Sequence, residues 1–266
     1  MTLFTPLRPN PAAPLARANP VAKLLAAVIL MGVLFVSVDP LTPAIVLAGL
    51  AACVPLTGIA VRDLLVRSRP ILIAAVAIGL LNIVFAAEHA GTPMRVGPWT
   101  VGSESVLAGL ALALRLAAIA MSGVLAIVTT DPTDLADSLI QQARVSPRFA
   151  VGALAAARLM PIMAAEWQSL ALARRARGVS AGGSPLVALR LAFGRLLAML
   201  IGAVRRGTRL ATAMESRGFG ARPCRSVARP QRTTRGDWIL MGAAAGLGLG
   251  AIVLGLALGS WRFLFG

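Results

Sequence analysis

The sequence predicts an all-α, polytopic membrane protein with about five transmembrane helices and a helical domain on the cytoplasmic side. Three observations predict this fold class. First, 58% of the 266 residues are hydrophobic and the mean hydropathy is +0.81, so the chain is too apolar for a soluble core to bury. Second, several apolar runs have about the 20 residues that a bilayer-crossing helix needs. Third, the positive charges fall mainly between these runs.

The first 22 residues are expected to form a cytoplasmic N-terminal tail. They are rich in proline and lack the apolar core and cleavage site of a signal peptide. Four transmembrane helices are predicted within residues 23–130, and a final one with a short tail within residues 236–266. The predicted spans are 23–38, 41–61, 70–87, 105–130 and 238–258. Pro43 and Pro55 are expected to bend or end the second span, and Pro70 to open the third.

The distribution of arginine predicts the orientation. Of the 26 Lys and Arg residues, three lie in or next to the N-terminal tail, three between the second and third spans, and seventeen between Arg144 and Arg235. Because Lys and Arg near span ends remain on the cytoplasmic side, the N-terminus is expected inside and the C-terminus outside. Such a charge pattern follows a membrane topology and argues against a nucleic-acid-binding surface.

Residues 131–235 are predicted to form a cytoplasmic helical domain. The run Asp131-Pro132-Thr133-Asp134 ends one helix and starts another. Pro147 and Pro161 are expected in the first turns of further helices. From Leu186 to Val204, apolar residues recur at spacings of three and four along one face, and Arg195, Arg205, Arg206 and Arg209 occupy the opposite face. This helix is expected to lie along a membrane surface or to pack on another helix.

The residue types of catalytic and metal sites are scarce. His89 is the only histidine and has no second ligand nearby, so no metal site is expected. Cys53 and Cys224 are expected at different depths and therefore unpaired. The one lysine, Lys23, is not part of a phosphate-binding loop, and no nucleophile–base arrangement is evident. The sequence therefore predicts a non-catalytic chain without a cofactor of its own.

Two segments forty residues apart repeat each other. Ala176-Arg177-Gly178 and Ser216-Arg217-Gly218 each place an arginine between a small residue and a glycine at the predicted end of a helix. A glycine there ends the helix in a left-handed conformation and leaves the arginine at its tip. Either segment alone fits a helix anchored at an anionic leaflet. The pair predicts two equivalent tips that dock into two equivalent acidic grooves of a partner.

The chain resembles, over nearly its whole length, the transmembrane T component of energy-coupling factor (ECF) transporters, the EcfT/CbiQ-like family. The motifs that carry the resemblance are Asn19 to Leu24, Thr129 to Pro132 followed by Leu135-Ala136, Arg158 to Pro161, Ala173 to Gly178 and Ala213 to Phe219. The family pattern is Ala-Arg-Gly twice, and Ser216 replaces the alanine of the second copy.

The resemblance implies a subunit of an ATP-driven importer of vitamins or metal ions in a bacterial inner membrane. It implies that Arg177 and Arg217 each tip a coupling helix that docks into one of two ABC-type ATPase subunits, which would hold the MgATP. It further implies that a separate membrane-embedded, substrate-binding S component packs against these helices. The transported substrate is left open, as is whether the two ATPases are identical.

Three further arginines are candidate partner contacts, namely Arg115, Arg158 and Arg174. Arg115 lies inside the fourth span, where a charge is costly, so it is expected either to hold the S component or to pair with Asn82 or a carbonyl. Glu166 is expected to bridge to Arg158 or Arg174.

Two other functions remain open from the residues. A membrane-embedded lipid-processing enzyme would have to use Asp131, Asp134 and Asp137, which are the available carboxylates near the membrane face. A self-sufficient secondary carrier would need broken half-length helices and polar spans, which the sequence does not show.

Overall fold

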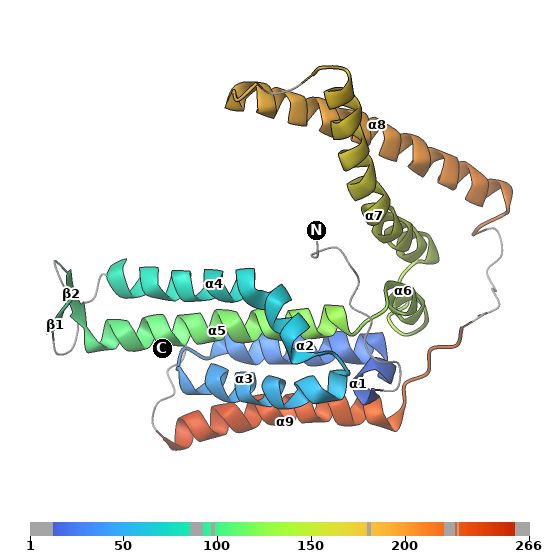
Figure 1. Ribbon diagram of the computed structural model, residues 1–266. Helices are drawn as coiled ribbons and strands as arrows, with labels where there is room; N and C mark the ends of the chain where they lie inside the picture. The colour runs from blue at the N-terminus through green and yellow to red at the C-terminus, as the bar shows by residue number, and fades with distance from the viewer. Residues whose placement is uncertain are drawn as a thin grey trace. The chain divides into compact units, whose positions relative to one another are not determined.

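The computed structural model (Figure 1) describes residues 13–85, 93–96, 99–179, 182–220, 227 and 229–258. The chain divides into two compact units. Met1–Ser138 and Gln231–Gly266 form the first, here called the bundle unit, and Leu139–Pro230 form the second, here called the hairpin unit. Both links between the units therefore lie close to the predicted domain boundaries at 131 and 235. The all-α class is confirmed, because helices make up nearly all of the described elements.

Helices α2, α3, α5 and α9 pack together in the bundle unit, and α4 packs along α5. The bounds are α1 Pro14–Arg17, α2 Pro20–Val36, α3 Leu41–Cys53, the 3₁₀ turn η2 Val54–Thr57, α4 Val61–Phe85, α5 Ser103–Val128 and α9 Arg235–Ala257. A further helix, α6 Pro132–Gln141, runs across the boundary between the units.

Local signals in the sequence explain the ends of these helices. The Asn19 side chain accepts a hydrogen bond from the Val21 amide, and Pro20 occupies the first turn of α2, where a proline costs nothing. Pro55 lies in η2, which ends in a left-handed Gly58, so the prediction that Pro55 ends the second span is confirmed. The predicted helix start at Pro132 is confirmed as well.

Two proline predictions are wrong. Pro70 was expected to open a helix but lies inside α4, which begins at Val61, and Pro161 lies inside α7 rather than in a first turn. A proline removes one intrahelical hydrogen bond, yet a long helix continues through it when the residues on both sides are good helix formers. Ser68, which could have capped a helix starting near Pro70, instead donates to the Leu64 carbonyl at 3.0 Å within α4, and Leu159-Met160 before Pro161 offers no cap.

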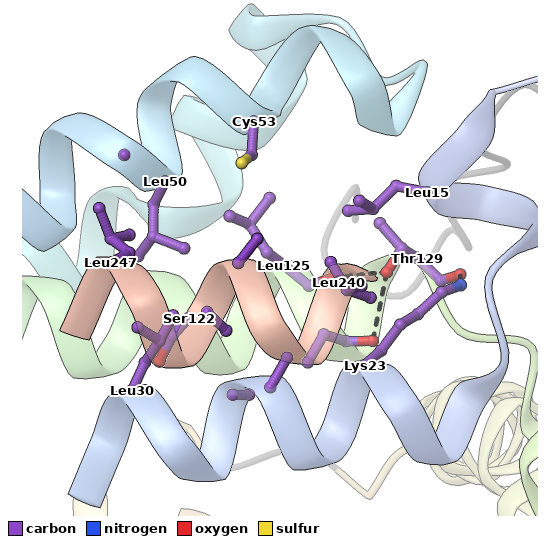
Figure 2. A pocket seen from close by; sticks show the side chains of 16 residues that line it. Leu15, Lys23, Leu30, Leu50, Cys53, Ser122, Leu125, Thr129, Leu240 and Leu247 are labelled. Carbon is purple, nitrogen blue, oxygen red and sulfur yellow. Dashed lines mark hydrogen bonds between the residues drawn. The ribbon is translucent and has the colours of Figure 1, made fainter. Parts of the chain in front are cut away.

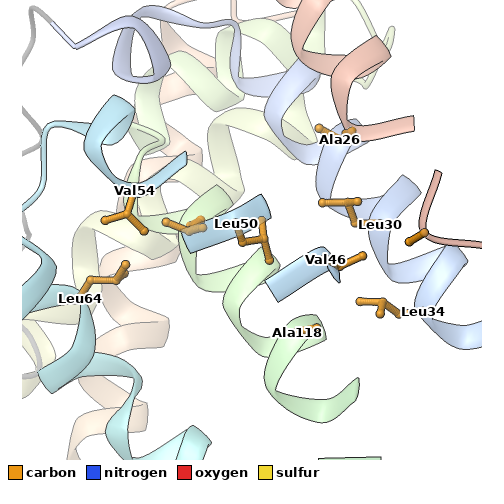
Figure 3. Packing of buried hydrophobic residues seen from close by; sticks show 11 residues of the cluster. Ala26, Leu30, Leu34, Val46, Leu50, Val54, Leu64 and Ala118 are labelled. Carbon is orange, nitrogen blue, oxygen red and sulfur yellow. The ribbon is translucent and has the colours of Figure 1, made fainter. Parts of the chain in front are cut away.

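The core of the bundle unit is formed by small and branched side chains from four helices (Figure 3). Leu30 and Leu34 of α2, Val46 and Leu50 of α3, and Ala118 of α5 belong to one cluster of buried side chains. Leu34, Val46 and Ala118 are completely buried. These contacts fix the packing of helices that are otherwise covered with exposed apolar side chains.

Two glycines allow α4 and α5 to approach closely. A Cβ atom built on Gly79 would lie 2.8 Å from the carbonyl oxygen of Gly109, and one built on Gly109 would lie 2.7 Å from the carbonyl oxygen of Gly79. Neither distance is sterically tolerable between heavy atoms. The two helix backbones therefore touch at this crossing, as small residues allow in membrane helix pairs.

Within the described residues, five helices are long and apolar enough to cross a membrane: α4, α5, α7, α8 and α9. The predicted number is therefore matched, and α4, α5 and α9 correspond to the third, fourth and fifth predicted spans. The first two expected spans correspond to α2 and to α3 with η2, which are shorter apolar helices, while α7 and α8 belong to the hairpin unit. The sequence assigned residues 147–216 to the cytoplasmic domain because of their arginines, whereas length and composition also allow α7 and α8 to span.

One element was not predicted from the sequence. Residues expected to form an outer loop contain a short antiparallel pair, β1 Pro93–Val96 and β2 Trp99–Gly102, in which Pro93 pairs with Gly102 and Val96 with Trp99. It leads directly into α5. His89 and Cys224 lie outside the described residues.

Candidate functional site

The hairpin unit consists mainly of two long helices, α7 Pro147–Ala176 and α8 Pro185–Ser216. Figure 1 shows them crossing each other. Pro147 occupies the first turn of α7, as predicted, and Pro185 does the same in α8. The repeated Arg-Gly segments form the C-terminal ends of these two helices.

The end of α7 has a well-defined hydrogen-bonding pattern. Arg177 is the C-cap, and Gly178 follows with φ = 75°. The Gly178 amide donates to the Arg175 carbonyl at 2.9 Å, and the Val179 amide donates to the Arg174 carbonyl at 3.0 Å. This pair of bonds is a Schellman motif, which satisfies the last carbonyls of a helix and requires a left-handed residue.

The end of α8 repeats this pattern residue for residue. Arg217 is the C-cap and Gly218 has φ = 69°. The Gly218 amide donates to the Glu215 carbonyl at 2.9 Å, and the Phe219 amide donates to the Met214 carbonyl at 3.0 Å. The left-handed glycines predicted from the sequence are therefore confirmed at both ends.

Both arginines of the two tips are exposed. Each is the C-cap residue of its helix and lies one residue before a left-handed glycine. Ser216 differs from its counterpart Ala176 but leaves the geometry unchanged, because its hydroxyl donates to the Ala213 carbonyl at 3.0 Å within α8. The tips thus present two matched, forked cations that suit an acidic groove.

The two helices contact each other through charged side chains. Arg206 of α8 forms a 2.7 Å ion pair with Glu166 of α7 and also approaches the sulfur of Met163 at 3.4 Å. The Arg195 guanidinium stacks on the ring of Trp167 at 4.3 Å, a cation–π contact. Glu166 therefore does not bridge to Arg158 or Arg174 as predicted, since its partner lies forty residues away on the other helix.

Arg174 connects α7 to α8 near the first tip. Its Nη1 donates to the Leu191 carbonyl of α8 at 2.8 Å, and its guanidinium lies where a side chain on Gly194 would have to be. The structure thus gives this candidate partner contact an intramolecular role. Arg158, another candidate, is exposed on α7.

These contacts place the two tips far apart. Arg174, close to the first tip, touches Leu191 in the first half of α8, and Arg217 lies at the far end of that helix. At 1.5 Å per residue, α8 separates Leu191 from Arg217 by roughly 40 Å. The two tips are therefore too far apart to lie in one groove.

The apolar stripe of α8 faces away from α7. Arg195 and Arg206, on the opposite face, make the contacts with α7, whereas the stripe is exposed, for example at Leu186, Phe193 and Leu200. The sequence predicted that this helix lies on a membrane or packs on another helix. The helix pairing uses the polar face, which leaves the apolar face for a membrane or a second protein.

Arg115, the candidate within α5, lines a cavity of about 550 Å³ in the bundle unit. Asp39, Asn82 and Glu104 line the same cavity. Among the described residues no hydrogen bond joins Arg115 to Asn82, while the Asp39 carboxylate is near enough to attract it electrostatically. The cavity provides the polar surroundings that a charge inside a spanning helix needs.

A buried polar cluster in the bundle unit was missed by reasoning from the sequence. The Nζ of Lys23, which is 5% exposed, donates to the Thr129 carbonyl at 2.7 Å and to the Ala16 carbonyl at 3.2 Å. Figure 2 shows Lys23 reaching Thr129 beside an apolar cavity lined by Leu30, Leu125 and Leu240. A single lysine at the start of an apolar helix was the available signal.

Asp237 belongs to the same cluster. The cluster is here called the polar joint and consists of Asn19, Lys23, Thr129, Thr234 and Asp237. One carboxylate oxygen accepts a hydrogen bond from the Asn19 backbone N–H at 2.7 Å. The other accepts from the Thr234 backbone N–H at 2.6 Å and from the Thr234 hydroxyl at 2.9 Å. Thr234 and Asp237 form a capping box at the start of α9, whose Thr-x-x-Asp spacing was readable in the sequence.

Two of the three carboxylates required by an enzymatic alternative, Asp131 and Asp134, make structural contacts. The Asp131 carboxylate accepts the Thr133 amide at 2.7 Å at the start of α6, and Asp134 contacts Gln231. Within the described ranges no group of three or more His, Cys, Asp or Glu residues is arranged to hold a metal ion. No observation favours the lipid-processing enzyme.

The fold and the two tips define a class: a helical, multi-pass membrane protein that carries a separate pair of long helices with matched cationic ends. A family model described as cobalt transport protein (CbiQ) matches residues 11–226. The chain therefore belongs to the CbiQ family, as an EcfT/CbiQ-like T component, and the resemblance inferred from the motifs is confirmed.

Curated relatives agree with this assignment. The chain is 26% identical over 243 residues to the energy-coupling factor transporter transmembrane protein EcfT of Exiguobacterium sibiricum, covering 88% of this chain and 92% of the relative. The proteins of the same name from Thermosediminibacter oceani and Thermanaerovibrio acidaminovorans are 28% and 29% identical over 251 and 259 residues. These alignments cover 89% and 92% of this chain, and 92% and 94% of the relatives.

Proposed function

We propose that this T component couples ATP hydrolysis in two partner ATPase subunits to the movement of a membrane-embedded S component that binds a vitamin or a metal ion. The observation that carries the proposal is the pair of matched Schellman ends at Gly178 and Gly218. Each tip would enter an acidic groove of one ATPase subunit, and MgATP would be held by those subunits rather than by this chain.

The distance between the tips supports two ATPase subunits rather than one. Along α8, Leu191 lies near the first tip and roughly 40 Å from Arg217, so each tip needs its own groove. Two like grooves at a fixed separation are a property of a dimer or pseudodimer. The exposed apolar stripe of α8 supports the remaining part of the proposal, since it offers a surface for the S component.

The proposal places the hairpin unit on the cytoplasmic side. Although α7 and α8 are long enough to span a membrane, residues 139–230 contain most of the arginines of the chain. The shorter helices α2 and α3 would then span together with α4, α5 and α9, which leaves the N-terminus inside and the C-terminus outside.

The test is the double substitution Arg177→Ala and Arg217→Ala in a tagged chain purified from its native membranes. The wild-type chain is expected to bring down ATPase subunits with MgATP-hydrolysing activity, and the double variant to lose them or to leave hydrolysis uncoupled from transport. Both guanidiniums contribute charge-assisted hydrogen bonds in the proposed grooves, and such bonds are worth about 1.5–3 kcal/mol each.

The matched control replaces Arg205 and Arg209, two exposed arginines of α8 that lie between its ends, by alanine. This control removes the same charge and should keep the ATPase subunits bound. Full assembly and transport by the Arg177 and Arg217 double variant would overturn the proposal.

A further inference from the structure

The polar joint lies where both links to the hairpin unit leave the bundle unit. One link runs from Thr129, after the end of α5, through α6 to residue 139, and the other runs from residue 230 through Gln231 to Thr234 and α9. Thr129, Thr234 and Asp237 are all members of the joint. The first turn of α2 therefore contacts the bundle end of both links.

The hydrogen bonds of the joint connect residues that are far apart in sequence. Lys23 and Thr129 are 106 residues apart, and Asn19 and Asp237 are 218 apart. Asn19, Lys23, Thr129 and Asp237 are each at most 5% exposed. Breaking a hydrogen bond between groups buried this deeply leaves a donor or an acceptor unpaired, which is costly. The joint therefore resists displacement of either link.

Amide side chains also hold the two links against each other. In the bundle unit the Gln231 Nε2 reaches the Asp134 carboxylate at 3.5 Å. In the hairpin unit the Gln141 Nε2 donates to the Arg229 carbonyl at 2.9 Å. The links are therefore cross-connected on both sides of the boundary as well as anchored at Lys23 and Asp237.

Electrostatics adds to this arrangement. The Asp134 carboxylate on the first link and the Asp237 carboxylate on the second both attract the Lys23 ammonium. Together with Arg17 and Gln231 they line a hollow of about 930 Å³. Lys23 thus lines the same hollow as an acidic group connected to each link.

We infer that Lys23 and Asp237 are positioning residues that fix both links to the bundle, so that movement of the α7–α8 hairpin is transmitted to the membrane helices instead of being absorbed by the links. This role rests on the proposed coupling function. Lys23 acts through the links and contacts neither tip.

The test uses the complete complex purified through a tagged chain in which Cys53 and Cys224 are replaced by alanine. Spin labels are placed at Leu56 in the bundle unit and Leu172 in the hairpin unit, both of which are exposed. The distance distribution between the labels is measured without nucleotide and after trapping with MgATP and orthovanadate. In the otherwise unchanged chain, trapping is expected to shift the distribution.

In Lys23→Met the ATPase subunits should stay bound because both tips are intact, but the distribution should broaden and the vanadate-induced shift should be lost. Lys23→Arg keeps a buried donor and should restore the shift at least in part, which a change in packing alone would not explain. Arg62→Met, which removes an exposed cation from the start of α4, is the matched control and should behave like the wild type.

If the Lys23→Met protein does not accumulate, Gln231→Leu is measured in its place. This substitution removes only the contact of the half-buried Gln231 side chain with Asp134. It should reduce the shift. A shift of wild-type size and width in Lys23→Met, or in Gln231→Leu where that variant replaces it, overturns the inference and leaves the proposed function standing. Failure of the proposed function shows instead as full assembly and transport by the Arg177 and Arg217 double variant.

Discussion

At the scale of single residues, the two helix tips depend on glycine for a reason that is entirely local. Gly178 has φ = 75° and nothing lies within 4 Å of the position that a Cβ would occupy. A side chain there would meet no steric obstacle from other parts of the chain. Its cost would come only from the left-handed backbone, about 1–2 kcal/mol for an ordinary residue.

We therefore predict that Gly178→Val weakens the Schellman end of α7 while Gly178→Asn largely preserves it. Valine is β-branched and avoids the left-handed region, whereas asparagine enters it with little strain. Amide hydrogen exchange of a peptide covering residues 174–179 should be faster in the valine variant, because the Val179 amide loses its bond to Arg174. Equal exchange in both variants would show that the left-handed glycine is not required.

The tips also show why the sequence was informative here. A Schellman motif joins residues no more than five positions apart, so the Arg-Gly pattern and the preceding helical periodicity are sufficient to predict it. The partner of Glu166 was not predictable in this way. Both Arg158 and Arg174 were closer in sequence, and only the crossing of α7 and α8 brings Arg206 to 2.7 Å.

At the scale of elements, the contact between α4 and α5 depends on Gly79 and Gly109. Each glycine would place a Cβ less than 3 Å from the other helix's backbone oxygen. A backbone atom cannot move aside as a flexible side chain can, so the helices would have to separate.

We predict that Gly79→Ala lowers the stability of the detergent-solubilised protein by about 1–3 kcal/mol, the usual cost of overpacking. Gly250→Ala on α9 is the matched control, because nothing lies within 4 Å of its Cβ position, and its effect should be small or slightly favourable. The thermal unfolding midpoint of each variant checks this. A Gly79→Ala midpoint equal to that of the control would show that α4 and α5 are free to separate.

Helix boundaries show a similar division between local and tertiary causes. The start of α6 at Pro132 and the end of the second predicted span at Pro55 follow from caps and turns that the sequence displays. The start of α4 at Val61 and the passage of α7 through Pro161 do not. In those helices the gain from a continuous packed or lipid-facing surface exceeds the loss of one hydrogen bond.

At the scale of the whole molecule, the location of α7 and α8 decides the topology. If both helices lie at the cytoplasmic face, the connection between them is inside. If both cross the membrane, as their length and composition allow, that connection is outside. The two arrangements leave the C-terminus on the same side, so only the connection distinguishes them.

We predict that Val179→Cys, in a chain without Cys53 and Cys224, reacts with a membrane-impermeant thiol reagent only after right-side-out vesicles are opened. Val179 is 43% exposed, so the reagent can reach it once it has access to that side. Leu258, at the C-terminal end of α9, is 69% exposed, and Leu258→Cys should react in intact vesicles. Reaction of Val179→Cys in intact vesicles would place α7 and α8 across the membrane.

The sequence by itself determined what depends on composition and on short-range backbone chemistry. It determined the membrane class, the repeated Arg-Gly ends and the family to which the chain belongs. Hydropathy, charge distribution and Schellman geometry each involve neighbouring residues only, which is why they can be read from a single chain.

The tertiary structure decided which distant residues meet and which faces remain free. It joined Lys23 to Thr129 and Asn19 to Asp237 across 106 and 218 residues, and it turned the arginine face of α8 toward α7 while leaving the apolar stripe exposed. An amphipathic pattern defines two faces but not the partner of either one. That choice depends on the packing of all helices together.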